Sequence, residues 1–373
     1  MTLLEKVDSK QKLEKFIDFP HDLYEDDPNY VPEIFIGQRD LLTPGKHPFH
    51  EHSQIQLFTV HANGVMKGRI AAILNNNHNT FNKATDGFFG FFDCVDDQSI
   101  AHSLFAAASG WLKEKGATTL IGPVNPSTNE TCGLLVEGFD KPPVVLMPFC
   151  KSYYARLIEK EGFEKKMDLL AYDIRVNTLN DRTVKLQDAL LKRLESKNIV
   201  LRSINMKDFA GEVKKIKEIY NAAWDANSGF VPFTDAEFNY LAKDLKLILD
   251  PGFCFIAEHE GKPVGFALAL PDINQVQAKV KRGRLFPFGI FKLLLGKKKI
   301  NYMRVPTLGV IDGYRKMGIE ACFYASIIKR CVDKKMIGGE ASWILEQNTL
   351  MNKAIENIKG VVHKRYRIFQ KQL

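Results

Sequence analysis

Several features that define other classes of protein are scarce or missing in this sequence of 373 residues. A membrane-spanning helix needs about 18 consecutive apolar residues, and no stretch of this sequence comes near that length. The first residues, MTLLEKVDSKQKLEKF, lack the apolar run of a secretion signal. The six cysteines form no Cys-x-x-Cys pair, which is typical of reduced structural thiols and not of a disulfide framework or a zinc site. We therefore expect a cytoplasmic protein that uses no metal.

Acidic residues are absent from one long segment. Between Gln277 and Ile300 the sequence has eight lysines and arginines and no acid, so this segment accounts for the whole net charge of +8. Such a concentration argues against a protein that binds nucleic acid over its whole surface. Phenylalanines and leucines are interleaved with the bases, so the segment could lie on a membrane surface or cover an acidic acceptor. Because Pro287 and Gly289 interrupt a helix, we expect a packed insert with solvated lysines instead.

An internal repeat divides the chain, which is longer than one hydrophobic core usually supports. Two hairpins, in QIQLFTVHANGVMKGRIAAIL and GFCFIAEHEGKPVGFALAL, have turn glycines at Gly64 and Gly261, an offset of 197 residues. Each hairpin is followed by a strand, a helix, a second strand, a second helix and a last strand. The glycines that follow the second helices, Gly162 and Gly360, are offset by 198 residues, so the register persists through both copies.

The repeat predicts an α/β fold with a mixed sheet in two tandem domains, at residues 1–175 and 176–373. The basic segment is then an insert at 277–299 in the second domain. In the first domain one helix has its apolar residues on a single stripe, which we expect to be buried. The stripe consists of Leu104, Phe105, Ala108, Trp111 and Leu112.

The segment LGVIDGYRKMGIEA, from Leu308 to Ala321, is the most informative part of the sequence. A strand-like run from Tyr302 to Val310 leads into a glycine-containing turn, and a helix begins at about Gly318. The first N–H groups of a helix have no intrahelical partners and lie at the positive end of its dipole, so they can receive a phosphate. Arg315 and Lys316 add positive charge beside them.

This segment resembles the acyl-CoA signature of the GNAT acyltransferase superfamily, Arg/Gln-x-x-Gly-x-Gly/Ala, with Arg315 and Gly318 in the first two defined positions. The resemblance implies that Leu308 and Val310 line the pantetheine arm of CoA and that the Val310 N–H meets the thioester carbonyl. It also implies that the turn holds the pyrophosphate through Arg315, Lys316, Gly318, Ile319, Glu320 and Ala321. Glu320 is a departure from the signature, because its carboxylate repels a pyrophosphate and its Cβ occupies space that the family leaves open.

The resemblance covers nearly the whole chain but is weaker in the first copy. Where the second copy has Arg315 to Gly318, the first has Cys94 to Ser99, which contains no glycine and two acids. We therefore expect that the first domain has no CoA pyrophosphate site and serves as a scaffold or as a wall of the acceptor site. Asp97 or Ser99 suits the N-cap of the following helix.

Acyl transfer to an amine needs a base, and Glu346 is our first candidate because it ends the strand next to the CoA-like strand. Asn348 follows and either touches the cofactor, as the resemblance implies, or caps the next helix. The tyrosine that many family members have seven residues later is replaced by Ile355. Tyr314 and Tyr366 are the conceivable substitutes, and we take Tyr366 as the second catalytic candidate, although packing in a strand also explains it.

A long polar loop in the first copy, GPVNPSTNETCGLLVEGFDKPP, is a candidate for the acceptor site between the domains. The alternative is that its side chains bond to nearby backbone and form turns. The residues concerned are Asn125, Ser127, Asn129 and Glu130.

The sequence thus predicts a tandem GNAT-like N-acetyltransferase that moves an acyl group from acetyl-CoA, or from another acyl-CoA, to a small-molecule or peptide amine. The acetyl group is implied by the resemblance alone. The alternative is a non-catalytic protein of GNAT fold that binds CoA or a small molecule, which Glu320 and the missing tyrosine favour. No nucleic-acid partner is expected, a membrane partner rests on the basic insert alone, and the oligomeric state stays open.

Overall fold

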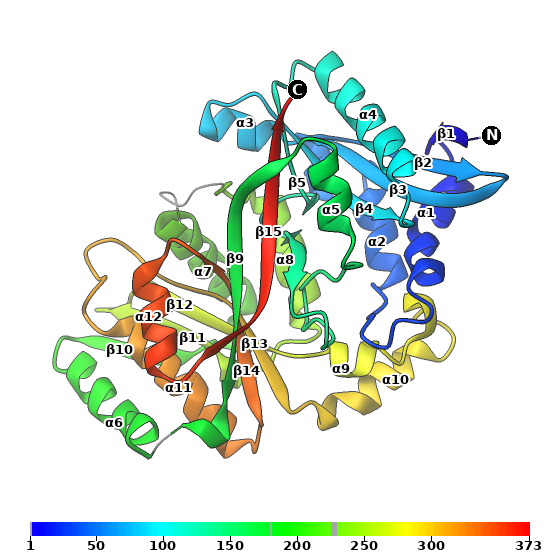
Figure 1. The fold of residues 1–373 in the computed structure, drawn as a ribbon. Coiled ribbons are helices and arrows are strands. Elements are labelled where there is room, and N and C mark those ends of the chain that lie inside the picture. Colours follow the sequence, from blue (N-terminus) through cyan, green and yellow to red (C-terminus); the bar gives the residue numbers. More distant parts are fainter. Residues whose placement is uncertain (1, 180, 225–229) are drawn as a thin grey trace. The chain divides into compact units, whose positions relative to one another are not determined.

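The structure is a computed structural model that describes residues 2–179, 181–224 and 230–373 (Figure 1). The chain forms two compact units. Unit 1 comprises Met1–Leu169, Asn274–Lys297 and Lys364–Leu373, and unit 2 comprises Leu170–Ile273 and Lys298–His363. These units differ from the two halves of the sequence, because most of the basic insert belongs to unit 1.

Unit 1 contains strands of a mixed sheet with helices packed on it, and a separate two-stranded sheet formed by β6 and β7. Its strands are β1 (Thr2–Lys6), β2 (Gln54–Ala62), β3 (Val65–Leu74), β4 (Asp86–Cys94), β5 (Thr119–Gly122), β6 (Val124–Asn125), β7 (Thr131–Cys132) and β8 (Leu134–Glu137). Its helices are α1 (Lys10–Leu23), α2 (Phe35–Leu42), α3 (Asn76–Asn82), α4 (Gln98–Glu114), α5 (Tyr154–Lys160), α9 (Asn274–Gln277) and α10 (Gly289–Gly296).

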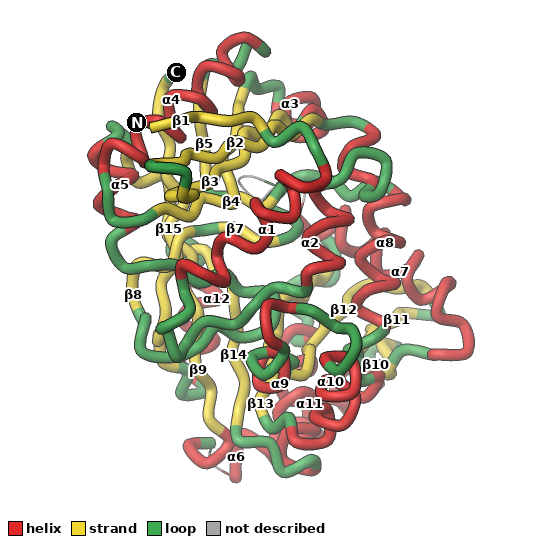
Figure 2. Tube along the Cα trace, turned by 90° about the vertical axis from the view of Figure 1, so that its right-hand side faces the viewer, coloured by secondary structure: helices red, strands yellow, loops and turns green. Residues whose placement is uncertain are grey.

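The strands of unit 1 follow the order β1-β2-β3-β4-β5, antiparallel except for the parallel pair β4 and β5. Helix α4 packs on β2 and β3 (Figure 2). The predicted stripe of α4 is confirmed at Leu104, Phe105, Ala108 and Leu112, which are buried, whereas Trp111 is half-buried. Asp97 is the N-cap of this helix and accepts a hydrogen bond from the N–H of Ser99.

Unit 2 repeats the same succession of elements. Its strands are β10 (Ile199–Ser203), β11 (Cys254–His259), β12 (Lys262–Pro271), β13 (Tyr302–Val310) and β14 (Gly338–Leu345). Its helices are α6 (Asp181–Glu195), α7 (Phe209–Trp224), α8 (Asp235–Lys246), α11 (Ile319–Asp333) and α12 (Thr349–Asn357). The strand order is β10-β11-β12-β13-β14, with only β13 and β14 parallel among these described pairs.

Alternation along β11 shows how this sheet is covered on both faces. Phe255 and Ala257 pack into the core that contains residues of α6 and α11. Cys254 and Ile256 pack into a second core with residues of α7. Because neighbouring side chains of a strand point to opposite faces, α11 and α7 cover opposite faces of the sheet.

The last strand of each sequence copy contributes residues to both units. Strand β9 (Glu164–Arg175) follows α5, and its residues from Leu170 onward belong to unit 2. Strand β15 (Val361–Gln372) follows α12, and its residues from Lys364 onward belong to unit 1, where Phe369 to Gln372 pair antiparallel with β5. The alternating α/β succession predicted from the repeat is confirmed, and the mixed sheet has the expected class.

The basic insert differs from our expectation of a packed helix with solvated lysines. One face of α10 does pack, through Gly289 and Gly296. The prediction is wrong for the large apolar side chains between Phe286 and Leu295, five of which are exposed.

Candidate functional site

The last residues of β13 have main-chain N–H groups that face away from its antiparallel partner β12. The Ile311 N–H donates to the Val264 carbonyl at 3.0 Å, so Ile311 and Val264 form a hydrogen-bonded pair of the antiparallel ladder. Hydrogen-bonded and non-hydrogen-bonded pairs alternate in such a ladder, so Gly309 bonds to β12 and its neighbours Leu308 and Val310 do not. The N–H groups of Leu308 and Val310 therefore lie on the other edge of β13.

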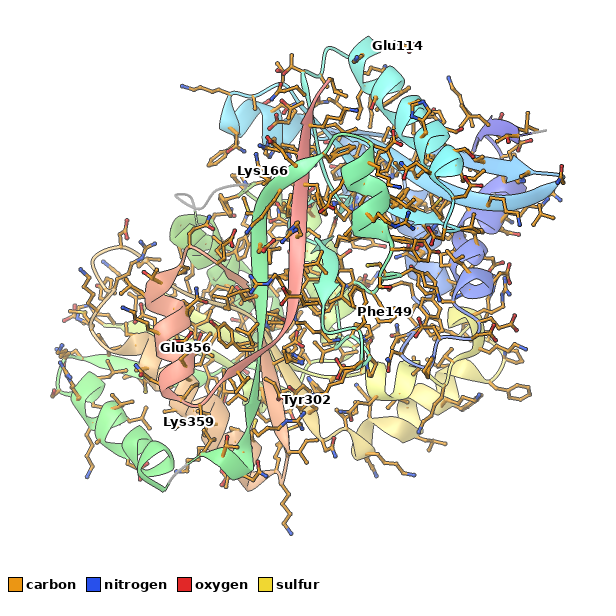
Figure 3. The ribbon with its side chains drawn as sticks, viewed as in Figure 1. Glu114, Phe149, Lys166, Tyr302, Glu356 and Lys359 are labelled. Atoms are coloured by element: carbon orange, nitrogen blue, oxygen red, sulfur yellow. The ribbon has the colours of Figure 1, made fainter. Side chains whose placement is uncertain are left out.

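On that other edge β13 leaves its parallel neighbour β14. The register between these described strands runs from Tyr302, labelled in Figure 3, to Val305 and no further. Pro306 comes next and has no N–H to donate to a ladder, and β13 has one extra residue relative to β12 between Arg304 and Thr307. The bulge and the proline explain why the two strands part, which leaves the edge at Leu308 and Val310 open.

Buried polar atoms without a partner lie on the strands that flank this opening. Among the described residues, Thr307 Oγ1 on β13 and Trp343 Nε1 on β14 are shielded from solvent and form no hydrogen bond. Such groups are rare in folded proteins, because each one costs free energy comparable to a lost hydrogen bond.

Helix α11 begins directly after the turn that follows β13. Its N-cap is Gly318, whose φ of +96° favours glycine and which offers no capping side chain. The Cys322 N–H is the first to bond within the helix, to the Gly318 carbonyl at 3.0 Å. The three N–H groups before it, from Ile319 to Ala321, have no intrahelical partner. That they receive the pyrophosphate stays a prediction.

Arg315 bonds to main-chain carbonyls, and its predicted contact with the pyrophosphate stays a prediction. Its Nε donates to the Val310 carbonyl at 3.2 Å, its Nη2 donates to the Ala223 carbonyl at 2.9 Å, and Nη1 lies 3.0 Å from Asp312 Oδ1. The guanidinium thus fastens the turn to β13, while Lys316 is exposed. Glu320 is half-buried in the first turn of α11, where its carboxylate lies near Tyr324.

The end of β14 is held by a pair of buried side chains that the sequence did not indicate. Asn352 donates through Nδ2 to the carbonyls of Leu345 (3.2 Å) and Glu346 (3.1 Å), and it accepts from the Tyr172 hydroxyl at 3.0 Å. Glu346 itself is half-buried. Asn348 accepts from the Met351 N–H at 3.2 Å and caps α12, so the capping alternative is confirmed for it.

Sequence reasoning also missed a histidine. His363 Nε2 lies 2.8 Å from Glu340 Oε2, and Glu340 also accepts from the Ser342 hydroxyl at 2.6 Å. A carboxylate accepts hydrogen bonds, so the proton of the neutral imidazole is on Nε2 and the lone pair is on Nδ1. Nδ1 is buried and has no partner among the described residues. These three residues come from β14 and β15, and only the fold brings them together.

Tyr324 connects α11 and α12, the helices that follow β13 and β14. Its hydroxyl lies 3.1 Å from Met351 Sδ. Burial and, secondarily, the Glu320 carboxylate raise the pKa of Tyr324, so its hydroxyl keeps its proton at neutral pH. We did not consider Tyr324 from the sequence.

The matching position of unit 1 is already occupied. Cys94 pairs with Gly68 as Val310 pairs with Gly265, so Cys94 is the counterpart of Val310. The Cys94 N–H donates to the hydroxyl of Tyr154 at 3.0 Å, and that hydroxyl donates to Asp93 at 3.2 Å.

The same Asp93 completes a fully bonded cluster in unit 1. It accepts from the Tyr24 hydroxyl at 2.9 Å and from Arg69 Nε at 2.8 Å. Both side chains are buried. Because every partner is satisfied within the unit, this cluster stabilises the fold and offers no open donor.

The other predicted site residues lie in unit 1. Tyr366 is fully buried on β15, opposite Leu135 of β8. Asn125 accepts from the Phe91 N–H at 2.6 Å, and Ser127 accepts from the Asn129 N–H at 3.1 Å. Side-chain-to-backbone bonds of this kind are those of the alternative interpretation, in which the polar side chains of the loop form turns.

Glu130 has a separate contact in unit 1, since its Oε1 lies 3.6 Å from Nε2 of the buried His47. An acceptor role for Asn125, Ser127, Asn129 and Glu130 and a catalytic role for Tyr366 stay predictions. Across the part of the chain that the structure describes, no three His, Cys, Asp or Glu side chains form a metal-binding group, and none of the helices could span a membrane.

Comparison with solved structures defines the class of protein. Over its whole length the chain matches a tandem GNAT protein from the clavulanic acid biosynthesis pathway, with a TM-score of 0.58, 10% identity and 98% of that chain covered. It also matches a GCN5-related N-acetyltransferase from Sphaerobacter thermophilus, with a TM-score of 0.54, 11% identity and 95% coverage. The protein has the tandem GNAT fold that the sequence predicted.

Two curated proteins are similar in sequence along the whole chain. Protein YghO of Escherichia coli (strain K12) is 38% identical over 373 residues, which span 98% of this chain and 94% of YghO. The bacterial ceramide synthase of Caulobacter vibrioides is 36% identical over 374 residues, which span 98% of this chain and 96% of that protein. No family model matches the sequence. The chain belongs to the family of these two proteins.

Proposed function

We propose that the protein is an N-acyltransferase that moves a long-chain acyl group from CoA to the amine of a long-chain amino alcohol. The observation that carries the acyl-transfer step is the open edge of β13 at Val310, followed directly by the bare N-terminus of α11. The fold and the family support this reading. The choice of acceptor is supported by the relative named bacterial ceramide synthase, since a ceramide is the amide of a fatty acid and such an amino alcohol.

The main chain of unit 2 would bind the donor. The N–H groups of Ile319 to Ala321 would hold the pyrophosphate, and the pantetheine would lie along β13 beside Leu308. The Val310 N–H would donate to the thioester carbonyl and stabilise the negative charge that develops on its oxygen. Arg315 acts indirectly, because it holds the turn that sets the distance between β13 and α11.

A base must remove a proton from the amine before it attacks the thioester carbon. Of two candidates we favour His363, because Glu340 accepts from its Nε2 and its buried Nδ1 has no partner among the described residues. Glu346, our choice from the sequence, is the second. The Tyr324 hydroxyl would donate a proton to the departing thiolate of CoA. Transfer is then direct, with no acyl-enzyme intermediate.

The alternative is a non-catalytic protein that binds CoA, and the carboxylate of Glu320 at the anion receptor favours it. One assay separates the two readings. The purified chain is incubated with acetyl-CoA or palmitoyl-CoA and with sphinganine or a short amine, and both free thiol and amide product are measured. We expect amide from palmitoyl-CoA and sphinganine. Acetylation of the short amine alone would contradict the lipid acceptor, and binding without any amide would establish the alternative.

A further inference from the structure

The basic insert of unit 1 presents large apolar side chains to solvent. Five of them lie within ten residues, and most of each side chain is exposed. Their exposed fractions are 70% for Phe286, 72% for Phe288, 59% for Phe291, 59% for Leu294 and 77% for Leu295. We call these five side chains the apolar face. Single exposed apolar residues are ordinary, whereas a contiguous set marks an interaction surface.

The orientation of α10 explains why its bulky face is outside. Gly289 and Gly296 lie against the unit, where an added Cβ would come within 2.3 Å of the Arg284 carbonyl oxygen and of Val276 Cγ1 respectively. Only glycine permits so close an approach. Ile290 and Leu293 are half-buried on the same side of the helix. The side chains at the opposite positions therefore point to solvent.

The insert is fastened to unit 1 beside α1 and α2 (Figure 1). Gln277 donates to the Pro32 carbonyl at 2.9 Å, Arg282 donates to Asp22 at 2.6 Å, and Arg284 donates to Asp18 at 2.8 Å. These contacts hold the apolar face in a fixed place on the unit, so it is a built surface and not a loose loop.

Positive charge flanks the apolar face in the sequence. Lys279, Lys281 and Lys292 are exposed, and within the described residues they form no ion pair. The chain continues from α10 into three lysines, and no acid occurs between Gln277 and Ile300. Arg282 and Arg284 are neutralised by their aspartates, so the uncompensated charge of the insert in unit 1 belongs to Lys279, Lys281 and Lys292.

We propose that the apolar face docks this protein on an anionic lipid bilayer, with its phenylalanines and leucines in the interface and its lysines among the headgroups. Charge decides between this partner and a second copy of the chain. A symmetric dimer through the same face would bring two sets of lysines together, whereas acidic headgroups complement them. The proposal does not rest on the proposed function. If the acceptor is a lipid amine, a protein docked on the bilayer would encounter it there.

Vesicle flotation with the full-length chain tests the proposal. We expect binding to vesicles of phosphatidylcholine with about 30 mol% phosphatidylglycerol, little binding to phosphatidylcholine alone, and release by salt. The variant Phe286→Ser/Phe288→Ser/Leu295→Ser should lose about tenfold in affinity for each side chain removed. The variant Lys279→Glu/Lys281→Glu/Lys292→Glu should lose about fivefold for each lysine.

The control is Val65→Ser/Leu247→Ser, which removes two apolar side chains that are 57% and 72% exposed outside the insert. It should bind vesicles as the wild type does. Equal binding to both kinds of vesicle, or no effect of either insert variant, would overturn the proposal. A dimer that the serine variant dissociates, without vesicle binding by the wild type, would also overturn it.

Discussion

The main-chain N–H of Cys94 donates to the hydroxyl of Tyr154 at 3.0 Å, at the position that corresponds to Val310 in the second copy. In unit 1 this N–H group is therefore bonded to a tyrosine of the same unit, whereas the corresponding N–H group of unit 2 lies on an open strand edge. The two copies share a succession of elements but not a chemistry. The first copy bonds this N–H within its own fold, whereas the second has it on the open edge of β13.

The closed position of unit 1 should show in its stability. Tyr154→Phe removes a fully buried hydroxyl and leaves the Cys94 N–H without a partner, so we expect a loss of about 1–3 kcal/mol in the free energy of unfolding. Tyr153→Phe is the matched control, because its half-buried hydroxyl donates to the Cys94 carbonyl at 2.8 Å and should matter less. Urea unfolding measures both. CoA binding should be unchanged in each variant, and its loss in Tyr154→Phe would place the donor site in unit 1.

Glu320 should weaken the donor site. Glu320→Gln removes the charge and should tighten CoA binding about two- to fivefold at low salt. One charge at a helix terminus changes the free energy of interaction by about 0.3–1 kcal/mol, which corresponds to this change in affinity. Glu320→Gly should tighten it further by removing the Cβ. The exposed Glu218 of α7 supplies the control Glu218→Gln, which should leave the affinity unchanged. Calorimetric affinities that do not respond to either change at Glu320 would mean that the pyrophosphate binds elsewhere.

The two candidate bases predict different outcomes. If His363 accepts the proton, His363→Gln should lower kcat by about a hundredfold or more. Gln can still donate to Glu340, so the fold should tolerate it. Glu346→Gln should then have little effect. The reverse pattern in kcat, with CoA affinity unchanged in both variants, would assign the base to Glu346.

Tyr324→Phe tests the proton donor. Because the raised pKa of Tyr324 keeps the hydroxyl protonated, the variant should lower kcat without moving the pH profile at or below neutral pH. Tyr324 would protonate the leaving thiolate. A thioester whose thiol is more acidic needs this proton less, so Tyr324→Phe should lower kcat less with such an acyl donor. An equal loss with both donors would mean that Tyr324 only supports the packing of α11 on α12.

The sequence predicted the parts of this molecule that depend on local pattern. The hairpin glycines Gly64 and Gly261, the apolar stripe of α4 and the turn before α11 follow from spacing within short windows. The contact between Glu340 and His363 and the one between Cys94 and Tyr154 join different elements, and no spacing rule encodes them. The exposed phenylalanines of the insert were missed because the burial of an apolar run depends on where its glycines pack.

The central claim is that the Val310 N–H on the open edge of β13 serves the thioester. Proline at 310 removes this donor without breaking the ladder with β12, whereas proline at 309 breaks a ladder bond. We would measure palmitoyl transfer and thermal unfolding for Val310→Pro and Gly309→Pro. Val310→Pro should melt near the wild type but lose about a hundredfold or more in kcat. Gly309→Pro should lose on the order of 2 kcal/mol in the free energy of unfolding. A well-folded Val310→Pro protein with full activity would contradict the account.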